Sequence, residues 1–194
     1  MILNNLIQKK IILASNSPRR KKLLEELGLN FEVRVKENIS ENIPENLKTE
    51  QVASYLAEQK AKQYEQELKA DEILITADTI VSCNGYILNK PLDYDDAVRM
   101  LDILSNTKHQ VITGVCIKSF SRSVSFSCTT DVYFKHLHED DIEYYIEKYR
   151  PYDKAGAYGI QEWIGYVGVE KIDGCFYNVV GLPIQNVYEE LKKF

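Results

Sequence analysis

The sequence lacks both long hydrophobic runs and an excess of basic charge. A membrane-spanning helix needs about 20 consecutive apolar residues, and no stretch of these 194 residues approaches that length. Lys and Arg number 24 against 29 Asp and Glu, which leaves a net charge of −5. Nucleic acids and anionic membranes favour positively charged proteins, so we expect neither as a partner. The first residues also lack the regions of a signal peptide, and we expect a cytoplasmic protein.

Cysteine is scarce, with four residues and no C-x-x-C pair. No histidine stands at the spacing of a zinc site, and the three histidines have no ligand spacing among themselves. Thiols stay reduced in a cytosolic protein. We therefore interpret the four cysteines as buried free thiols and expect no catalytic one: Cys83, Cys116, Cys128 and Cys175.

The composition that remains is ordinary for a globular protein, 44% hydrophobic and 27% charged, without repeats. Apolar periodicity and turn signals predict helices and strands in irregular alternation, with hairpins. This favours a single α/β domain over residues 1–194 with a mixed sheet. The expected strands are residues 10–15, 31–35, 72–83, 86–88, 109–117, 124–134, 163–171 and 175–180. The expected helices are residues 18–27, 49–68, 93–105, 139–149 and 183–193.

A run of four cations opens the first long helix. Ser17 and Pro18 have the properties of an N-cap and a first helical residue, and the basic run Arg19–Lys22 follows at once. Cations oppose the helix dipole at this end. A bound anion would reverse that effect, because free N–H groups, the Ser17 hydroxyl and the guanidinium groups form a phosphate cradle. A solvated basic turn is the alternative.

Two further charged residues stand among apolar neighbours. Lys60 shares a helix face with Leu56 and Tyr64, so it either extends to the edge of that face or reaches into a cleft and holds a phosphate. Asp78 lies inside the apolar strand 73–81, where a carboxylate is costly unless it is paired or bound to a metal. A structural ion pair, a metal ligand and a general base all remain open for Asp78.

Three loop positions have weaker signals. Glu41 lies in a polar loop and Lys90 follows a hairpin, and a solvated side chain is the default for each. The segment 153–161 combines a charged pair with small residues, and its glycines would let the backbone approach a ligand closely. The Gln161 amide could read the edge of a base, with a tight structural turn as the alternative.

Together these segments resemble the Maf family of nucleotide pyrophosphatases. The resemblance runs from about residue 10 to the C-terminus. It implies an α/β fold with a curved mixed β-sheet flanked by helices and two lobes around a deep cleft, similar to inosine triphosphatase, and a homodimer. The matching segments are LASNSPRR at 13–20, LAxxKA at 56–61, ADTIV at 77–81, KP at 90–91, HxVxTGV at 109–115, DKAGAYGIQ at 153–161 and VVGLP at 179–183.

The resemblance also implies an activity. A nucleoside triphosphate is cut between its α- and β-phosphates, giving the monophosphate and pyrophosphate, with Mg²⁺ or Mn²⁺ as cofactor. Asp78 matches the family's proton acceptor, and Glu41 and Asp78 would hold the metal ion. The residues that match its phosphate-binding cations are Arg19, Arg20, Lys60 and Lys90.

The base preference is implied by the same resemblance. Arg19, Thr79 and Gln161 match positions that set base choice, in the pattern of a branch that prefers dTTP and UTP, with modified pyrimidine nucleotides as a further class. Glu162 and Trp163 depart from the family pattern beside Gln161. Two alternatives stay open: a 7-methyl-GTP pyrophosphatase, and a nucleotide-binding regulator of cell division and septum formation with weak hydrolysis.

Overall fold

The computed structural model describes residues 3–36, 43–44 and 46–194. The chain forms two compact units. The first unit contains Met1–Asp78, Thr113–Cys128 and Gly181–Phe194, and the second contains Thr79–Ile112 and Thr129–Val180. That the whole chain forms a single domain stays a prediction.

Helices and strands alternate irregularly along the described chain, and together they confirm the predicted α/β class with a mixed sheet. The first unit holds η1(Asn4–Leu6), β1(Lys10–Leu13), α1(Pro18–Glu26), β2(Phe31–Val33), α2(Thr49–Lys62) and α7(Ile184–Leu191). The second holds β4(Tyr86–Leu88), α3(Tyr94–Leu104), α4(Glu139–Tyr149), η2(Ala155–Ala157), α5(Trp163–Gly168), β7(Val169–Asp173) and α6(Phe176–Val180). Three long strands contribute residues to both units: β3(Glu72–Cys83), β5(Lys108–Lys118) and β6(Ser123–Phe134).

The sheet has seven hydrogen-bonded strands in the order β2-β1-β3-β5-β6-β7, and β4 pairs with β3. In the first unit β1 pairs in parallel with β2 and with β3, and Leu13 stands opposite Val33 and Ile75. In the second unit β4 is antiparallel to β3, and β7 is antiparallel to β6. Parallel and antiparallel pairs in one sheet are the mixed arrangement that the hairpin signals predict.

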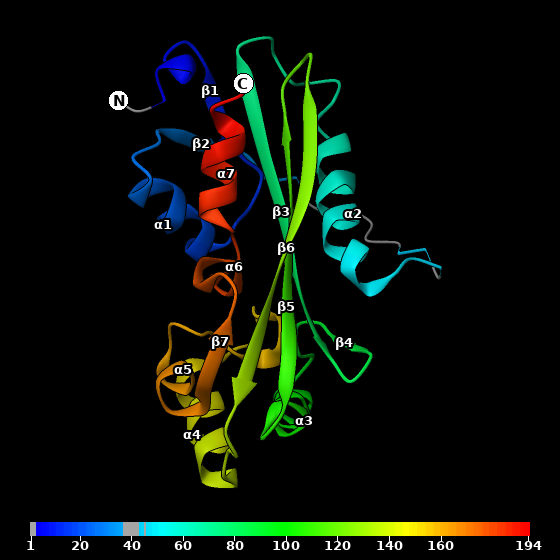
Figure 1. Cartoon of the computed structure of the whole chain (residues 1–194), viewed down its shortest axis with the longest axis vertical. Helices are drawn as coiled ribbons and strands as arrows, with labels where there is room; N and C mark the ends of the chain where they lie inside the picture. The colour runs from blue at the N-terminus through cyan, green and yellow to red at the C-terminus, as the bar shows by residue number, and fades with distance from the viewer. Residues whose placement is uncertain (1–2, 37–42, 45) are drawn as a thin grey trace. The chain divides into compact units, whose positions relative to one another are not determined.

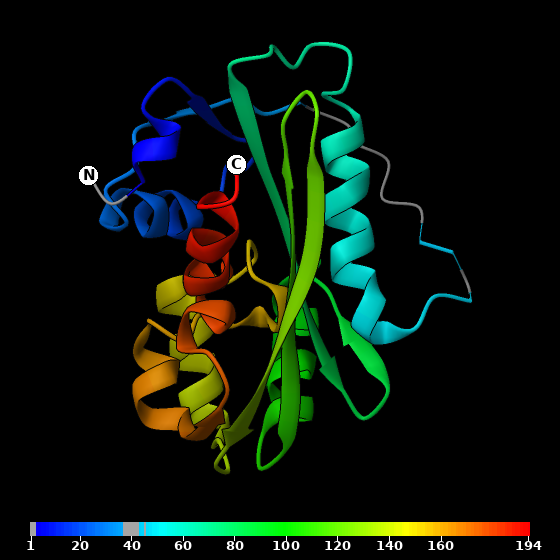
Figure 2. The ribbon, with the colours of Figure 1, turned by 45° about the horizontal axis from the view of Figure 1, so that its top comes forward.

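Helix α2 covers one face of the first unit's strands, while α1 and α7 lie on the other (Figures 1 and 2). Its apolar side packs on β1, β3 and β5 because Val, Ala, Leu and Tyr residues recur at helical spacing. Gly114 on β5 allows this contact because it has no side chain. A Cβ at this position would lie 2.1 Å from the Ser54 nitrogen and would clash with α2. The buried residues of this contact are Ile12, Ala57, Ala61, Tyr64, Leu68, Leu74 and Cys116.

The second unit has its own buried core. Helix α3 begins where Asp93 accepts a hydrogen bond from the Asp96 backbone N–H at 2.9 Å, as its N-cap signal predicts. It contacts α4 and η2, and α4 contacts α5. His109 is buried among aromatic rings, edge-on to Phe134 and to Tyr158. The structure thus assigns a packing role to this histidine.

Of two predicted strands near the C-terminus, the one over residues 175–180 is wrong and the one over 163–171 is right only for residues 169–171, which belong to β7. Residues 163–168 form helix α5 rather than the start of a strand, and residues 176–180 form helix α6. Their Trp, Tyr, Phe and Val residues favour strands, but packing within the fold overrides that preference. Each helix is too short to show a 3.6-residue period. Helix α2 also ends at Lys62 rather than at residue 68, and turns follow it.

The four cysteines are free thiols, as expected. Cys83 and Cys116 are buried, whereas Cys128 and Cys175 are only half-buried, so the prediction of burial is wrong for these two. Strand β6, which carries Cys128, has no fully buried residue before Thr130.

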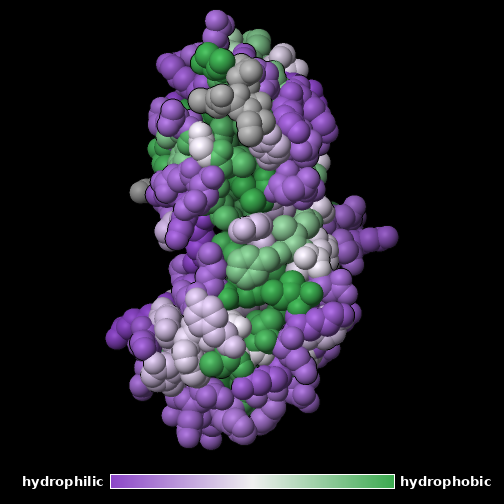
Figure 3. Space-filling view, turned by 60° about the vertical axis from the view of Figure 1, so that its left-hand side comes forward, coloured by the Kyte–Doolittle hydropathy of each residue, from purple (hydrophilic) through white to green (hydrophobic). Residues whose placement is uncertain are grey.

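None of the helices in the described residues has the length and apolarity that crossing a bilayer requires. Hydrophilic residues make up most of the face in Figure 3.

Candidate active site

The first turn of α1 is built as its sequence predicts. The Ser17 hydroxyl caps the helix by accepting a hydrogen bond from the Arg20 backbone N–H at 3.4 Å, and Pro18 is the first helical residue. Ser15, which is buried, accepts from the Ser17 backbone N–H at 3.2 Å. The helix has no acidic residue in its first turn. The combination of helix dipole and cations therefore attracts an anion at this end.

The side chain of Arg20 is held by backbone carbonyls from distant parts of the first unit. Its guanidinium donates to the Ala77 oxygen and to the Gly181 oxygen, each at 2.8 Å, and to the Ser15 hydroxyl at 3.2 Å. Burial lowers the pKa of Arg20, while the charge of Asp78 raises it and that of Arg19 lowers it. An arginine keeps its charge under such influences, so Arg20 is a fixed cation beside the carbonyl that precedes Asp78.

Lys60 and Asp78 form an ion pair within the first unit. Lys60 comes from α2 and Asp78 from β3, and their side chains are 17% and 16% exposed. The pair explains how a carboxylate is tolerated in an apolar strand, because a partly desolvated charge needs a partner. Both groups still reach solvent. The pair is therefore accessible to a ligand, and each of its members has the charge to bind one part of a metal-bound phosphate.

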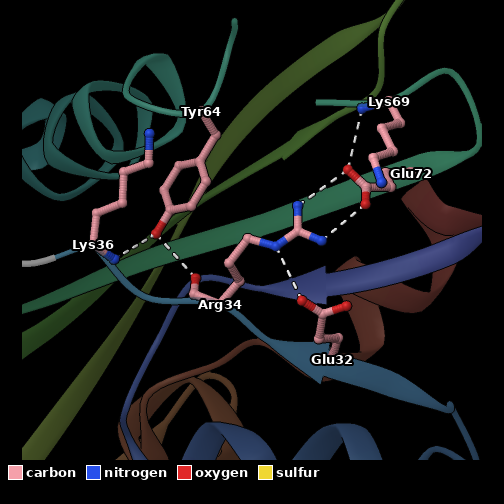
Figure 4. Close-up of polar contacts among 6 residues, drawn as sticks. All are labelled: Glu32, Arg34, Lys36, Tyr64, Lys69 and Glu72. Atoms are coloured by element: carbon pink, nitrogen blue, oxygen red, sulfur yellow. Dashed lines mark hydrogen bonds and ion pairs between the residues drawn. The ribbon is translucent and has the colours of Figure 1, made fainter. Parts of the chain in front are cut away.

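A second polar cluster fixes the elements that carry this pair (Figure 4). Glu72, buried at the start of β3, accepts two hydrogen bonds from the Arg34 guanidinium at 2.8 and 3.1 Å. Arg34 lowers the pKa of Glu72 to about 2. Tyr64, just after α2, donates to the Arg34 oxygen and accepts from the Lys36 N–H. The cluster joins the end of β2 to α2 and β3.

Arg19 lies beside Arg20 in the first turn of α1, in the first unit. Thr79, Lys90 and Gln161 belong to the second unit. Thr79 follows Asp78 on β3 and is half-buried, whereas Lys90 and Gln161 are exposed. Lys90 follows β4, next to Asn89, whose carbonyl oxygen accepts a hydrogen bond from the Gly156 N–H at 3.1 Å. This bond fastens the chain beside Lys90 to the segment 153–161.

That segment has an unusual backbone. Gly156 and Ala157 have φ values of +69° and +58°. The left-handed region is ordinary for glycine and strained for alanine. Gly156 also lies against Val81, whose side chain would be 3.0 Å from an added Cβ. Strain of this kind persists where the surrounding structure over-determines it, and it is concentrated at functional sites.

The candidate residues thus form two groups. The structure brings Lys60 and Asp78 into direct contact and places Arg20 one residue away from Asp78, at Ala77. Thr79, Lys90 and Gln161 belong to the second unit, on β3, after β4 and on a turn. Convergence of both groups on one pocket stays a prediction. The expected metal ligand Glu41 lies outside the described residues.

Asp78 is the described residue that could bind a divalent cation at this site. Mg²⁺ in phosphate-transfer sites is commonly held by one or two carboxylates and the phosphates of the substrate, and the accessible Asp78 carboxylate is a suitable oxygen ligand. Within the described ranges, no three His, Cys, Asp or Glu side chains gather closely enough to hold a metal ion by themselves. The Asp78 carboxylate therefore fits a cation shared with a phosphate.

Sequence reasoning missed several residues that shape the site. Ser15 and the carbonyl of Gly181 hold Arg20, and a backbone acceptor leaves no mark in a sequence. Tyr145 is fully buried on α4 and its hydroxyl accepts a hydrogen bond from the Gly159 N–H at 2.9 Å. Its spacing of three residues from Ile142 indicates only a core residue, so no sequence signal distinguished it.

Comparison with known proteins decides the family. The model of the Maf-like protein family matches residues 10–194. This chain belongs to the Maf-like family. Proteins named dTTP/UTP pyrophosphatase from Parabacteroides distasonis and Phocaeicola vulgatus are 51% and 52% identical to it, over 100% and 99% of this chain and 100% of each relative. A relative of the same name from Porphyromonas gingivalis is 50% identical, over 100% of this chain and 98% of its own.

A solved structure described as a nucleoside-triphosphatase, dITP/XTP pyrophosphatase, from Mycobacterium abscessus covers 66% of this Maf-like chain and 75% of its own. The TM-score is 0.38 and the sequence identity 14%.

Proposed function

We propose that this Maf-like protein is a nucleoside triphosphate pyrophosphatase that hydrolyses dTTP and UTP to the monophosphate and pyrophosphate. The observation that carries the proposal is identity of about half of all residues, over the full length, to relatives named dTTP/UTP pyrophosphatase. The Lys60–Asp78 pair and the cationic start of α1 support it, since both have the charge that phosphate binding requires.

The proposed roles follow from the charges of these residues. The first turn of α1, with Ser17, Arg19 and Arg20, binds phosphate oxygens through N–H and guanidinium donors. Lys60 and Lys90 neutralise further phosphate charge. Thr79, Gln161 and Arg19 contact the nucleoside and select its base. Electrostatic positioning of this kind supplies most of the rate acceleration in phosphate chemistry.

Asp78 acts as the proton acceptor. Its carboxylate orients a water molecule and accepts one of its protons as the water oxygen bonds to phosphorus. The bond between that phosphorus and the bridging oxygen breaks, and pyrophosphate leaves. The Lys60 ammonium holds the carboxylate in place until the substrate binds. General-base assistance contributes about 10²–10⁴-fold.

We propose Mg²⁺ or Mn²⁺ as the cofactor, held by Asp78 and Glu41 together with the substrate. A bound divalent ion neutralises phosphate charge and polarises the phosphate oxygens. Removal of metal with a chelator is expected to abolish pyrophosphate release, and either ion is expected to restore it. Unchanged turnover in the chelator would contradict this part of the proposal.

We further propose a cytoplasmic homodimer. The Maf-like family assignment supports it through the family resemblance, and the cytoplasm holds the dTTP and UTP pools on which such an enzyme acts. Sedimentation of the full chain at micromolar concentration is expected to give twice the monomer mass. A monomer at all concentrations up to that of the kinetic assay would contradict the dimer.

The decisive experiment for the function is a pyrophosphate-release screen with Mg²⁺ and Mn²⁺. We expect dTTP and UTP to be the best substrates, above CTP, the purine triphosphates and 7-methyl-GTP. Preference for 7-methyl-GTP would assign the chain to the other specificity. Tight binding of dTTP with almost no pyrophosphate release would instead favour a nucleotide-binding regulator.

A further inference from the structure

We propose that Tyr145 and Glu162 are positioning residues that hold the turn carrying Gln161 and thereby set the base selectivity of the enzyme. The inference rests on the proposed function and deepens it. It concerns only the second unit, where helix α4 and the start of α5 lie near each other (Figure 1).

Gln161 is a central residue of a four-residue turn. The backbone N–H of Glu162 donates to the carbonyl oxygen of Gly159 at 2.9 Å, which is the closing hydrogen bond of a β-turn. Gln161 stands third in this turn and is exposed, while Ile160 beside it is 6% exposed and buried in the core. The turn therefore presents one side chain to a ligand and anchors the other.

The hydroxyl of Tyr145 holds both ends of this turn. It accepts a hydrogen bond from the Gly159 N–H at 2.9 Å and donates one to the Glu162 carboxylate. Tyr145 is fully buried, so a rigid helix supplies the fixed point. An added Cβ at Gly159 would lie 2.8 Å from the Glu162 carboxyl carbon, so the glycine leaves room for this carboxylate.

Lys154 binds the other oxygen of the Glu162 carboxylate. Its ammonium lies 3.1 Å from the Glu162 carboxylate and donates to Asp153 at 2.7 Å. The Lys154 side chain is only 8% exposed, and a buried ammonium needs such partners. The Glu162 carboxylate is therefore bound on both oxygens, by Lys154 and by Tyr145, and rotating it away would break both contacts.

This arrangement has a consequence for selectivity. A side chain that reads the edge of a pyrimidine base by hydrogen bonds must be held within about 0.5 Å of its place. Loosening the turn lets Gln161 adapt to other bases, so discrimination falls while the chemical step at the phosphates continues. A cluster that only stabilised the fold would leave discrimination unchanged.

The test compares Tyr145→Phe and Glu162→Gln with Tyr144→Phe. Tyr144 is the matched control, because it neighbours Tyr145 on α4, is exposed, and its hydroxyl accepts a hydrogen bond from Lys148. Phenylalanine keeps the ring that contacts Trp163. Steady-state kinetics of pyrophosphate release are measured for dTTP, UTP, CTP and dGTP, and the melting temperature is measured for each variant.

We expect both test variants to lose about tenfold in the ratio of kcat/KM for dTTP over dGTP. The loss is expected in KM for dTTP, with kcat within about threefold, and Tyr144→Phe is expected to match the wild type. Unchanged discrimination in two folded variants would overturn the proposal. Loss of the fold in both would also overturn it, because the cluster would then be an element of stability alone.

Trp163 supplies a readout independent of turnover. It is the only tryptophan of the chain and follows Glu162 directly. Its ring packs edge-on against the Tyr144 ring, with the two ring centroids 4.8 Å apart. Its fluorescence is expected to change when dTTP binds, with weaker binding in Tyr145→Phe. If the wild type binds dTTP but releases no pyrophosphate, the proposed function fails while this binding comparison still decides the inference. Equal affinity of both proteins for dTTP would overturn it.

Discussion

The two units hold their candidate residues in different ways. In the first unit Lys60 and Asp78 stand on a helix and a strand and contact each other directly. In the second unit Lys90 follows a short hairpin, and Gln161 lies in a turn. Backbone hydrogen bonds hold the chain next to each of them. Arg20, Lys60 and Asp78, which are suited to the phosphates that all triphosphates share, are on regular elements. Gln161, which is suited to the variable base, is on a turn, and a turn is easier to alter than a helix or strand.

The largest effect is expected from Asp78→Asn in the first unit. The variant keeps the shape of the side chain but cannot accept the proton of water. We expect kcat for dTTP to fall about 10³-fold, with unchanged preference among bases. Asp71→Asn just before β3 is the control, since Asp71 forms an ion pair with an exposed lysine at 3.6 Å. Near-normal pyrophosphate release from Asp78→Asn would remove Asp78 from the mechanism.

A second prediction concerns the stability of the first unit. Glu72→Gln leaves the Arg34 guanidinium without its buried carboxylate, and we expect unfolding free energy to fall by about 3 kcal/mol at pH 7. The control is Glu32→Gln, because Glu32 is the second carboxylate that pairs with Arg34 and is more exposed than Glu72. This substitution is expected to cost less than about 1 kcal/mol. Urea unfolding measures both.

The pH dependence sharpens this prediction. The pKa of Glu72 is about 2 in the folded chain against an ordinary value of 4.5. Its carboxylate therefore stabilises the fold fully above pH 4.5, and this contribution is lost as pH falls toward 2. The difference between wild type and Glu72→Gln is expected to shrink over that window. A difference that stays constant from pH 5 to pH 3 would show that the charge is not its source.

For the second unit, His109 is expected to make stability depend on pH over a different range. Burial lowers its pKa to about 4 from 6.5. The unfolded chain binds a proton below pH 6.5 that the folded chain does not, so stability falls by up to about 3 kcal/mol as pH falls from 6.5 to 4. In His109→Gln this fall is expected to be absent, whereas the exposed His136→Gln is expected to behave as wild type. Identical pH curves for all three proteins would exclude His109.

The smallest effect on stability is expected from Gln161→Ala. The side chain is exposed, so we expect the unfolding free energy to change by less than about 0.5 kcal/mol. The preference for dTTP over dGTP is expected to fall about tenfold. Gln185→Ala, an exposed glutamine on α7 in the first unit, is the control for both measurements. Retained preference in Gln161→Ala would place base selection elsewhere and weaken the contrast between the units.

Sequence reasoning succeeded where a local rule applies. The N-cap at Ser17 and the hairpin at Asn84 and Gly85 follow from short-range hydrogen bonding and turn chemistry, and the structure confirms both. It failed for α5 and α6, which are too short to show a period. The partner of Asp78 could not be deduced either, because Lys60 is 18 residues away and on another element.

Composition, apolar periodicity and short motifs determined the fold class, most element boundaries, the family and the list of charged candidates, since each depends on residues close in the chain. Only the tertiary structure decided which candidates meet. It paired Lys60 with Asp78, tied Arg20 to carbonyls at Ala77 and Gly181, and clamped the Gln161 turn through a buried tyrosine. Such contacts join distant segments, and their energy depends on burial and geometry that no local pattern specifies.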